Sequence, residues 1–246
     1  MAYANTFMRH EIKYLLTERQ KQSILERISG MMTEDAYSRQ TISSIYCDNS
    51  DILIRTSLSK PIYREKLRLR AYGVPEDDST VFLEIKKKFR GTVYKRRAAM
   101  TYLQAYNYIC GGEAPEMPDY NGRQVMSEID YTTKRLSLRP AAAIFYDRRA
   151  FHGNDDGELR LTLDNNVRYR LDQTDLRFGT AGKLLKAQPD CVMEIKSAAA
   201  VPLWLADILA DLELTPGSFS KYGSVYKEKI AGEAGSINDI RSEFNV

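Results

Sequence analysis

The 246-residue sequence contains few of the residues that build disulfide frameworks or zinc sites. It has three cysteines and two histidines. Cys47, Cys110 and Cys191 are far apart, and none belongs to a CxxC pair. An odd number of widely spaced cysteines argues against a disulfide scaffold and is typical of a reducing compartment. We therefore expect a cytoplasmic protein that folds around an ordinary hydrophobic core.

The sequence also lacks a long hydrophobic run. A membrane-spanning helix needs about 20 consecutive apolar residues, whereas the most apolar stretch, residues 198–214, is interrupted by Pro202, Asp207 and Asp211. The N-terminal residues carry charges where a signal peptide would have its apolar core. We expect no transmembrane segment, although a separate membrane partner is compatible with this sequence.

Internal repeats, low-complexity linkers and breaks in composition are absent as well. The 43% of apolar residues suffices for a sizeable core, and a chain of this length often folds as one large domain. We predict a single domain over residues 1–246, with a short polar tail from about residue 228.

Charge of one sign is not in large excess, since the formal net charge is +3. This value excludes a generic polycation. Because no nucleic-acid-reading motif is present, nucleic acid is not an expected partner. The local balance differs, because basic residues greatly outnumber acidic ones between Lys60 and Arg97. This local excess predicts an anionic partner.

The sequence does contain strands with one charged stripe and one aliphatic stripe. In residues 81–97, VFLEIKKKFRGTVYKRR, two runs rich in β-formers flank Arg90-Gly91, which predicts a hairpin. Because side chains alternate between faces along a strand, Glu84, Lys86 and Lys88 share one face. The same alternation of charged and aliphatic residues returns in residues 11–13, 66–70, 158–164 and 193–196.

Two architectures accommodate these stripes. A one-sided sheet would bury its aliphatic face under helices and leave the charges in water. A closed barrel would instead line its lumen with the charges and carry the helices outside. The stripes hold mostly Arg and Lys with isolated carboxylates, as a site for a polyanion and its divalent metal would need. The charge types therefore favour the barrel, with the open sheet as the alternative.

The expected secondary structure alternates strands and helices along the chain. Strands are predicted at residues 7–15, 41–47, 63–72, 142–151, 158–164 and 192–197, in addition to the hairpin. Helices are predicted from Thr17 to near Gly30, from Ala98 to Cys110, from Ser127 to about Leu136, and from Pro202 to about Leu212. A short apolar segment at residues 52–54, a loop at 113–122 and an irregular stretch to about Gly182 connect them.

Nine motifs in order along the chain carry a resemblance to a known family. They are RHEIKYLL (9–16), SIYCD (44–48), EKLRLRAYG (65–73), FLEIKKKFRGTVYKRR (82–97), YDRRAF (146–151), LRLTLD (159–164), MEIKS (193–197), PLWL (202–205) and SFSKYG (218–223). The chain resembles the bacterial form of the VTC domain, the catalytic module of polyphosphate polymerases. That module is similar to the CYTH proteins and belongs to the triphosphate tunnel metalloenzymes.

The resemblance implies an α+β fold in which a closed antiparallel β-barrel has a charged lumen and helices packed outside. It implies an enzyme that transfers the terminal phosphate of ATP to a growing polyphosphate chain. It also implies a divalent cofactor, Mn²⁺ or Mg²⁺, bound by carboxylates that bridge to the phosphates. ATP and inorganic polyphosphate are the implied partners.

The resemblance assigns roles to residues of the charged stripes. Catalytic roles fall on Arg68, Arg70, Lys86, Arg148, Arg160 and Lys196. Phosphate binding falls on Lys13, Lys88, Lys95 and Lys221. Metal binding falls on Glu194 first, supported by Glu84 and Glu11. For Glu84 and Glu194 a neutralising ion pair with neighbouring cations is an alternative role, compatible with the first.

Two other functions stay open at the level of sequence. The same site could hydrolyse triphosphate or polyphosphate, or it could bind polyphosphate without turnover. The shorter hydrolases of the fold begin with E-x-E-x-K, whereas this chain has Arg9 in place of the first acid, before Glu11 and Lys13. That departure favours the VTC pattern.

Overall fold

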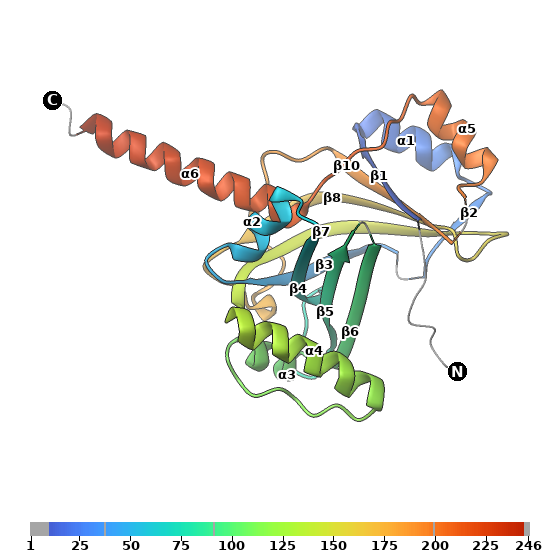
Figure 1. Ribbon diagram of the computed structural model, residues 1–246. Coiled ribbons are helices and arrows are strands. Elements are labelled where there is room, and N and C mark those ends of the chain that lie inside the picture. Colours follow the sequence, from blue (N-terminus) through green and yellow to red (C-terminus); the bar gives the residue numbers. More distant parts are fainter. Residues whose placement is uncertain (1–9, 37, 91, 199, 244–246) are drawn as a thin grey trace.

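The computed structural model describes residues 10–36, 38–90, 92–198 and 200–243, and it is built on one curled antiparallel sheet (Figure 1). The strand order is β1-β10-β8-β7-β3-β4-β5-β6, with β2 paired to β7 and β9 to β8. The strands are β1 (His10–Leu16), β2 (Met32–Glu34), β3 (Gln40–Asp48), β4 (Tyr63–Tyr72), β5 (Thr80–Phe89), β6 (Thr92–Thr101), β7 (Arg139–Gly153), β8 (Arg160–Arg170), β9 (Lys183–Leu184) and β10 (Cys191–Ser197). Figure 1 shows the long strand β7 bending across the molecule between the two halves of this sheet.

The sheet is an open half-barrel, so the α+β class is confirmed and the closed barrel is wrong. Within the described residues, β1 pairs only with β10 and β6 only with β5, which makes them the two edges. A later segment covers part of the β1 edge: Tyr14 forms a bridge with Pro216, and the Gly217 N–H donates to the Lys13 carbonyl at 2.7 Å. Because proline has no N–H to donate, this contact cannot extend into a full ladder.

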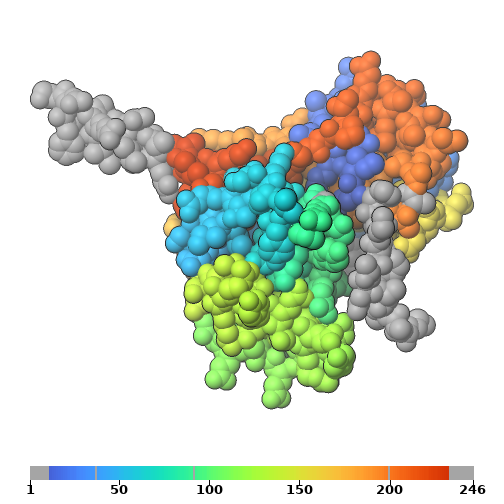
Figure 2. Space-filling model, viewed as in Figure 1, coloured from blue at the N-terminus to red at the C-terminus, as the bar shows by residue number. Residues whose placement is uncertain are grey.

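Helices cover the convex face of the sheet in two groups (Figure 1). The first group, α1 (Glu18–Arg27) and α5 (Leu203–Asp211), packs its apolar residues on β1, β8 and β10. The second group, α3 (Tyr102–Ile109) and α4 (Tyr120–Leu136), packs on β4, β5 and β6. Figure 2 shows the groups as separate masses, blue and orange above, green below.

Two further helices lie at one end of the half-barrel. They are α2 (Ile52–Ser59) and α6 (Lys221–Glu243), which are in contact with each other. Tyr222 and Val225 of α6 pack with Ile54 of α2 and with Ile144 of β7 in a third apolar cluster. The first turns of α6 therefore close this end, while the rest of the helix extends away from the body (Figure 1).

The first helix begins as predicted. The Thr17 hydroxyl accepts the Gln20 N–H and the Gln20 side chain accepts the Thr17 N–H, which is the reciprocal capping box. The strands at residues 41–47, 63–72 and 192–197 and the helix at 202–212 are also confirmed within a residue or two. The hairpin is confirmed as β5 and β6, whereas Phe7, Arg9 and Gly91 lie outside the described residues.

Several predicted boundaries are wrong. Residues 98–101 continue β6, because pairing with β5 outweighs the helical preference of Ala98 and Ala99. Helix α4 begins seven residues before Ser127, with Asp119 as its cap accepting the Gly122 N–H at 2.8 Å. The apolar segment at 52–54 is the first turn of α2, and β8 extends the strand predicted at 158–164 to Arg170. The polar tail from residue 228 continues as α6 to Glu243.

Candidate active site

Cross-strand register places the charged stripes on one face of the sheet. Directly opposed residues of antiparallel strands point to the same side. The register pairs Lys13 with Glu194, Lys196 with Arg160, Arg148 with Asp164, Arg68 with Glu84, and Lys86 with Lys95. Aliphatic residues of the same strands pack under the helices of the opposite face. We call the charged concave side the inner face.

Side chains from opposite ends of the strand order interact across the inner face. Lys86 belongs to β5, next to one edge of the sheet, yet its pKa responds to Glu11, Lys13 and Glu194 on β1 and β10. Burial lowers the pKa of Lys86, and the charge of Lys13 adds to that effect while the two glutamates oppose it. The curl of the sheet thus brings the distant stripes to one site.

Glu84 is the centre of a buried cluster on β4, β5 and β6. Its carboxylate lies 2.6 Å from Arg68, 2.9 Å from Lys95 and 3.6 Å from Arg70, and its side chain is 3% exposed. Burial alone would raise the pKa of Glu84, but these cations hold it well below its usual range. Burial also lowers the pKa of Lys95 to about 8, against the attraction of Glu84.

Glu194 forms a second cluster on β1 and β10. Lys13 bonds to Glu194 and, at 2.7 Å, to Glu11, while Lys196 lies 3.0 Å from Glu194. The Glu11 carboxyl is itself within hydrogen-bonding reach of Glu194. Burial would raise the pKa of Glu194, but Lys196 and Lys13 hold it well below its usual range. Two carboxylates therefore meet at this place, one of them mostly buried.

A third cluster surrounds Asp164 on β8. Arg148 donates to it through two nitrogens, at 2.6 and 2.8 Å, and Lys221 of α6 donates at 2.7 Å. The Lys221 ammonium also lies 4.1 Å from the ring centre of Tyr146. Asp164 and Tyr146 were not among the predicted site residues. The alternation of LRLTLD placed Asp164 on the charged stripe, which was the available signal.

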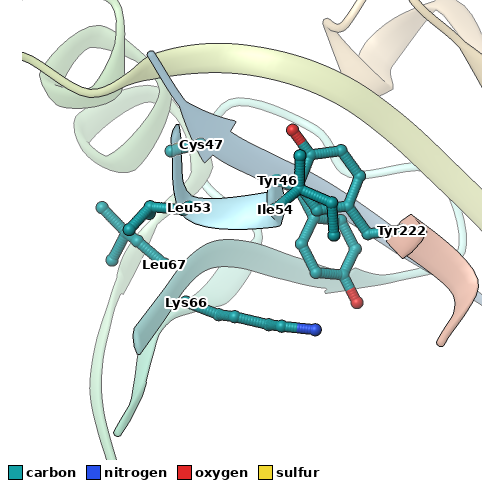
Figure 3. A pocket seen from close by; sticks show the side chains of 7 residues that line it. All are labelled: Tyr46, Cys47, Leu53, Ile54, Lys66, Leu67 and Tyr222. Carbon is teal, nitrogen blue, oxygen red and sulfur yellow. The ribbon is translucent and has the colours of Figure 1, made fainter. Parts of the chain in front are cut away.

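Tyr46 and Tyr222 mark the closed end of the inner face (Figure 3). Their rings stack with centres 4.8 Å apart, and Lys66 extends beside them. Tyr46 accepts a hydrogen bond from Arg68 at 3.3 Å, and Tyr222 donates to Asp48 at 3.0 Å. Burial alone would raise the pKa of Tyr46, but Arg68 and Lys66 lower it to about 8. The motifs SIYCD and SFSKYG contain these tyrosines, but the sequence alone predicts no role for either.

Two predicted residues lie apart from these clusters. Arg160 is 47% exposed and pairs with Asp35 at 2.8 Å, and the same carboxylate bonds to His152 at 2.7 Å. Lys88 lies near the tip of the β5–β6 hairpin, opposite Arg64 in the register. Within the basic triplet of β6, Lys95 points inward, whereas Arg96 pairs with Glu128 of α4 on the outside.

The donor set of the Glu194 cluster fits a divalent metal. The described residues include no group of three or more His, Cys, Asp or Glu side chains placed to hold a metal. Mg²⁺ is commonly bound by one or two carboxylates together with substrate phosphates and water. Glu11 and Glu194 provide two adjacent carboxylates on a face that is otherwise cationic. Glu84 fits a metal less well, because three cations already surround it.

The fold and the inner face define a half-barrel that presents cations and paired carboxylates to a common space. Comparison with protein families gives its membership: the VTC domain model matches residues 8–228, and the chain belongs to the VTC domain family. The family that the sequence motifs resembled is thereby confirmed. Membership together with this fold indicates a protein that acts on triphosphate or polyphosphate.

Solved structures with the same fold are distant in sequence. A putative adenylate cyclase from Bacillus halodurans matches with a TM-score of 0.54 at 11% identity, over 88% of this chain and 96% of that one. A putative adenylyl cyclase from Hippeastrum, described as having a dominant triphosphatase activity, matches with a TM-score of 0.56 at 15% identity, over 90% of this chain and 96% of that one. At such identities the likeness establishes the fold.

Membrane-spanning helices are not found in the described part of the chain, where every helix is too short or too polar to cross a bilayer.

Proposed function

We propose that this protein is a polyphosphate polymerase, which transfers the terminal phosphate of ATP to the end of a polyphosphate chain bound on the inner face. The observation that carries the proposal is the joining of Glu11 and Glu194 through Lys13, on a face where cations outnumber carboxylates. Membership of the VTC domain family supports the same reaction.

Cations of the inner face would bind and orient the two polyanions. The transferred phosphoryl group carries its charge on peripheral oxygens, so catalysis consists mainly of positioning and charge compensation. Arg68, Arg70 and Arg148 are suited to this because a guanidinium can hold two phosphate oxygens at once. Lys86 and Lys196 would share this catalytic role, and Lys13, Lys95 and Lys221 would bind phosphates of the chain. Arg160 and Lys88, which lie apart from the clusters, would bind phosphates farther along it.

The carboxylates would have different roles. Glu194 and Glu11 would hold Mn²⁺ or Mg²⁺, which supplies compensation for the charge of the phosphates. We assign Glu84 the orientation of Arg68 and Lys95, whose nitrogens lie 2.6 and 2.9 Å from it. The attacking group is a terminal phosphate of the growing chain, which is already anionic, so the reaction does not require a strong general base.

Hydrolysis is the second candidate. A hydrolase needs a carboxylate or another base to orient water. Asp164 is not free for this, because Arg148 and Lys221 hold both of its oxygens. Because Asp164 is held in this way, and Arg9 stands where the shorter hydrolases have their first acid, we favour the polymerase over the hydrolase.

Incubation of the purified protein with ATP and Mn²⁺ or Mg²⁺ tests the proposal, with and without a short polyphosphate primer. Gel electrophoresis should show a ladder of long polyphosphate, and ADP should form in step with it. Free phosphate without a ladder would establish the hydrolase instead. Tight polyphosphate binding without any turnover would leave a noncatalytic binding module.

A further inference from the structure

Some buried polar atoms of the described chain have no hydrogen-bond partner. They are Ser44 Oγ, Arg70 Nε, Thr162 Oγ1 and Thr133 Oγ1. A buried polar group without a partner costs about 1–3 kcal/mol. The first three lie on the inner face, whereas Thr133 lies on α4. The concentration of such atoms on one face indicates that something outside the chain provides their partners there.

Ser44 and Arg70 are neighbours. They oppose each other directly in the β3–β4 register, so their side chains leave the sheet side by side on the inner face. Ser44 is 1% exposed, and the Arg70 side chain is 11% exposed. The Nε–H of Arg70 can only donate, and the serine hydroxyl has a proton to donate as well. Both groups are therefore donors that lack an acceptor oxygen.

The nearby carboxylate does not supply that oxygen. Glu84 makes its short contacts to Arg68 and Lys95, and its distance of 3.6 Å from Arg70 Nε is too long for a hydrogen bond. Arg70 therefore keeps unsatisfied donor capacity next to a donor hydroxyl. A phosphate oxygen combines negative charge with acceptor capacity and matches both groups.

The adjacent serine provides a contrast. Ser43 is equally buried but points to the opposite face of β3, where its hydroxyl donates to the Gly73 carbonyl at 2.7 Å. Two consecutive serines of one strand thus differ in whether their hydroxyl has a hydrogen-bond partner. The protein itself satisfies Ser43 and leaves Ser44 without a partner.

We propose that Ser44 is a substrate-binding residue, whose hydroxyl and the neighbouring Arg70 Nε–H together hold one oxygen of a bound phosphate group. The class of ligand, a triphosphate or polyphosphate, rests on the proposed function. Because the hydroxyl and the guanidinium both donate, this subsite binds one acceptor oxygen, at the place on the inner face where Ser44 and Arg70 lie side by side.

Calorimetric titration with tripolyphosphate in metal-free buffer tests the subsite in three proteins: wild type, Ser44→Ala and Ser43→Ala. Ser44→Ala should bind about 10- to 100-fold more weakly, the effect of one lost hydrogen bond to a charged group. Its melting temperature without ligand should be unchanged or higher, because the substitution removes an unsatisfied hydroxyl. Ser43→Ala should show the reverse, with lower melting temperature and wild-type affinity.

A conservative change at the partner sharpens the result. Arg70→Lys keeps the charge and removes the Nε–H, so the Ser44→Ala effect on affinity should shrink in that background. Equal affinity of Ser44→Ala and wild type would overturn the proposal, and would mean that water alone satisfies the hydroxyl.

The outcomes separate this inference from the proposed function. Weaker tripolyphosphate binding by Ser44→Ala, in a protein that makes no polyphosphate ladder, would leave the subsite standing and remove the polymerase. A ladder from wild type together with unchanged affinity of Ser44→Ala would remove the subsite alone. Absence of tripolyphosphate binding by wild type would overturn both.

Discussion

At the scale of single residues, the buried carboxylates of the inner face have different surroundings and different expected roles. Glu194 has a second carboxyl beside it, whereas Glu84 has cations on every contact. The charge of Glu84 is thus compensated by the protein. The Glu11–Glu194 pair brings two carboxylates together beside Lys13 and Lys196, which suits a site that a metal and a phosphate chain complete.

Replacement of Glu194 by Gln should lower metal-dependent turnover by about 100-fold or more, because one metal ligand and the charge beside Lys13 and Lys196 are lost. Affinity for tripolyphosphate without metal should persist. The measurement is ADP release at saturating Mn²⁺ together with titration of the ligand. Glu128→Gln, which alters an outer-face partner of Lys87 and Arg96, is the matched control. Wild-type turnover of the Glu194 variant would remove its proposed role.

Arg68→Ala and Arg70→Ala should each weaken tripolyphosphate binding by about 10- to 100-fold, since each removes hydrogen bonds between charged groups. Arg96→Ala should bind as wild type does, because Arg96 pairs with Glu128 on the outer face. Calorimetry gives all three affinities. If neither inner-face variant differs from Arg96→Ala, the ligand binds elsewhere.

Affinity for tripolyphosphate should depend on pH through Lys95. Burial lowers the pKa of Lys95 to about 8, so the ammonium is charged below pH 8 and loses its charge as the pH rises further. Wild-type affinity should therefore fall, relative to Lys95→Arg, between pH 8 and 9.5, because arginine stays charged. The ionisation of the ligand is common to both proteins. Parallel profiles for the two would mean that Lys95 does not face the ligand.

Ionisation of Tyr46 should also weaken tripolyphosphate binding as the pH rises. Its pKa of about 8 means that a phenolate forms on the inner face as the pH rises, next to Arg68 and Lys66. Tyr46→Phe should therefore retain more of its affinity above pH 8 than wild type does. Combining this substitution with Lys95→Arg should give the flattest pH profile of the four proteins.

At the scale of elements, the strands were more predictable than the helices. A strand such as β4 alternates basic and aliphatic residues from Lys66 to Ala71, so its two faces follow from the sequence. The start of α3 does not, because Ala98 and Ala99 favour a helix and only pairing with β5 holds them in a strand.

The candidate site, too, is partly predictable from the sequence and partly dependent on tertiary contacts. The cations of the inner face follow from the strand pattern, because the pattern fixes which side each residue takes. The places where they meet depend on the curl of the sheet, which brings Lys86 near Glu11 and Glu194. The contributions of Tyr46 and Ser44 depend on a ring contact and on an atom without a hydrogen-bond partner, which a one-dimensional pattern does not contain.

The beginning of α4 gives a test at this scale. Asp119→Ala should lower the free energy of unfolding by about 1 kcal/mol, because the cap of the helix is lost. Ser127→Ala should leave stability unchanged or slightly raise it, because Ser127 is an exposed residue within the helix, where alanine is favoured. Urea unfolding measures both. A larger loss for Ser127→Ala would place the helix start where the sequence predicted it.

At the scale of the whole molecule, the cations of the inner face repel one another in the free protein. A bound polyanion should relieve this repulsion and so stabilise the folded state. Burial lowers the pKa of Lys66 and Lys86 as well as that of Lys95, so charging each of them opposes folding. A bound polyanion attracts the charged lysines, so their charged forms then favour the folded state. Stability and ligand binding are therefore linked throughout the half-barrel.

Tripolyphosphate at about 100 times its dissociation constant should add about 2.7 kcal/mol to the stability of the folded state. For a protein of this size that corresponds to a rise in melting temperature of about 5–10 °C. The rise should decrease with added salt, because the interaction is between charges. Sulfate at matched ionic strength is the control, and an equal rise with sulfate would mean that the effect is a general one of anions.

The basic run of β6 has a consequence for self-association. Strand β6 is a wall of the inner face and also an edge of the sheet, and exposed edges can pair with the edge of another molecule. Lys95, Arg96 and Arg97 give that edge a charge that repels its own copy. Lys95, which pairs with Glu84 on the inner face, therefore both attracts phosphate and helps to keep the proteins apart. A neutral replacement of Lys95 would reduce solubility together with affinity, whereas one of Arg96 would reduce solubility alone.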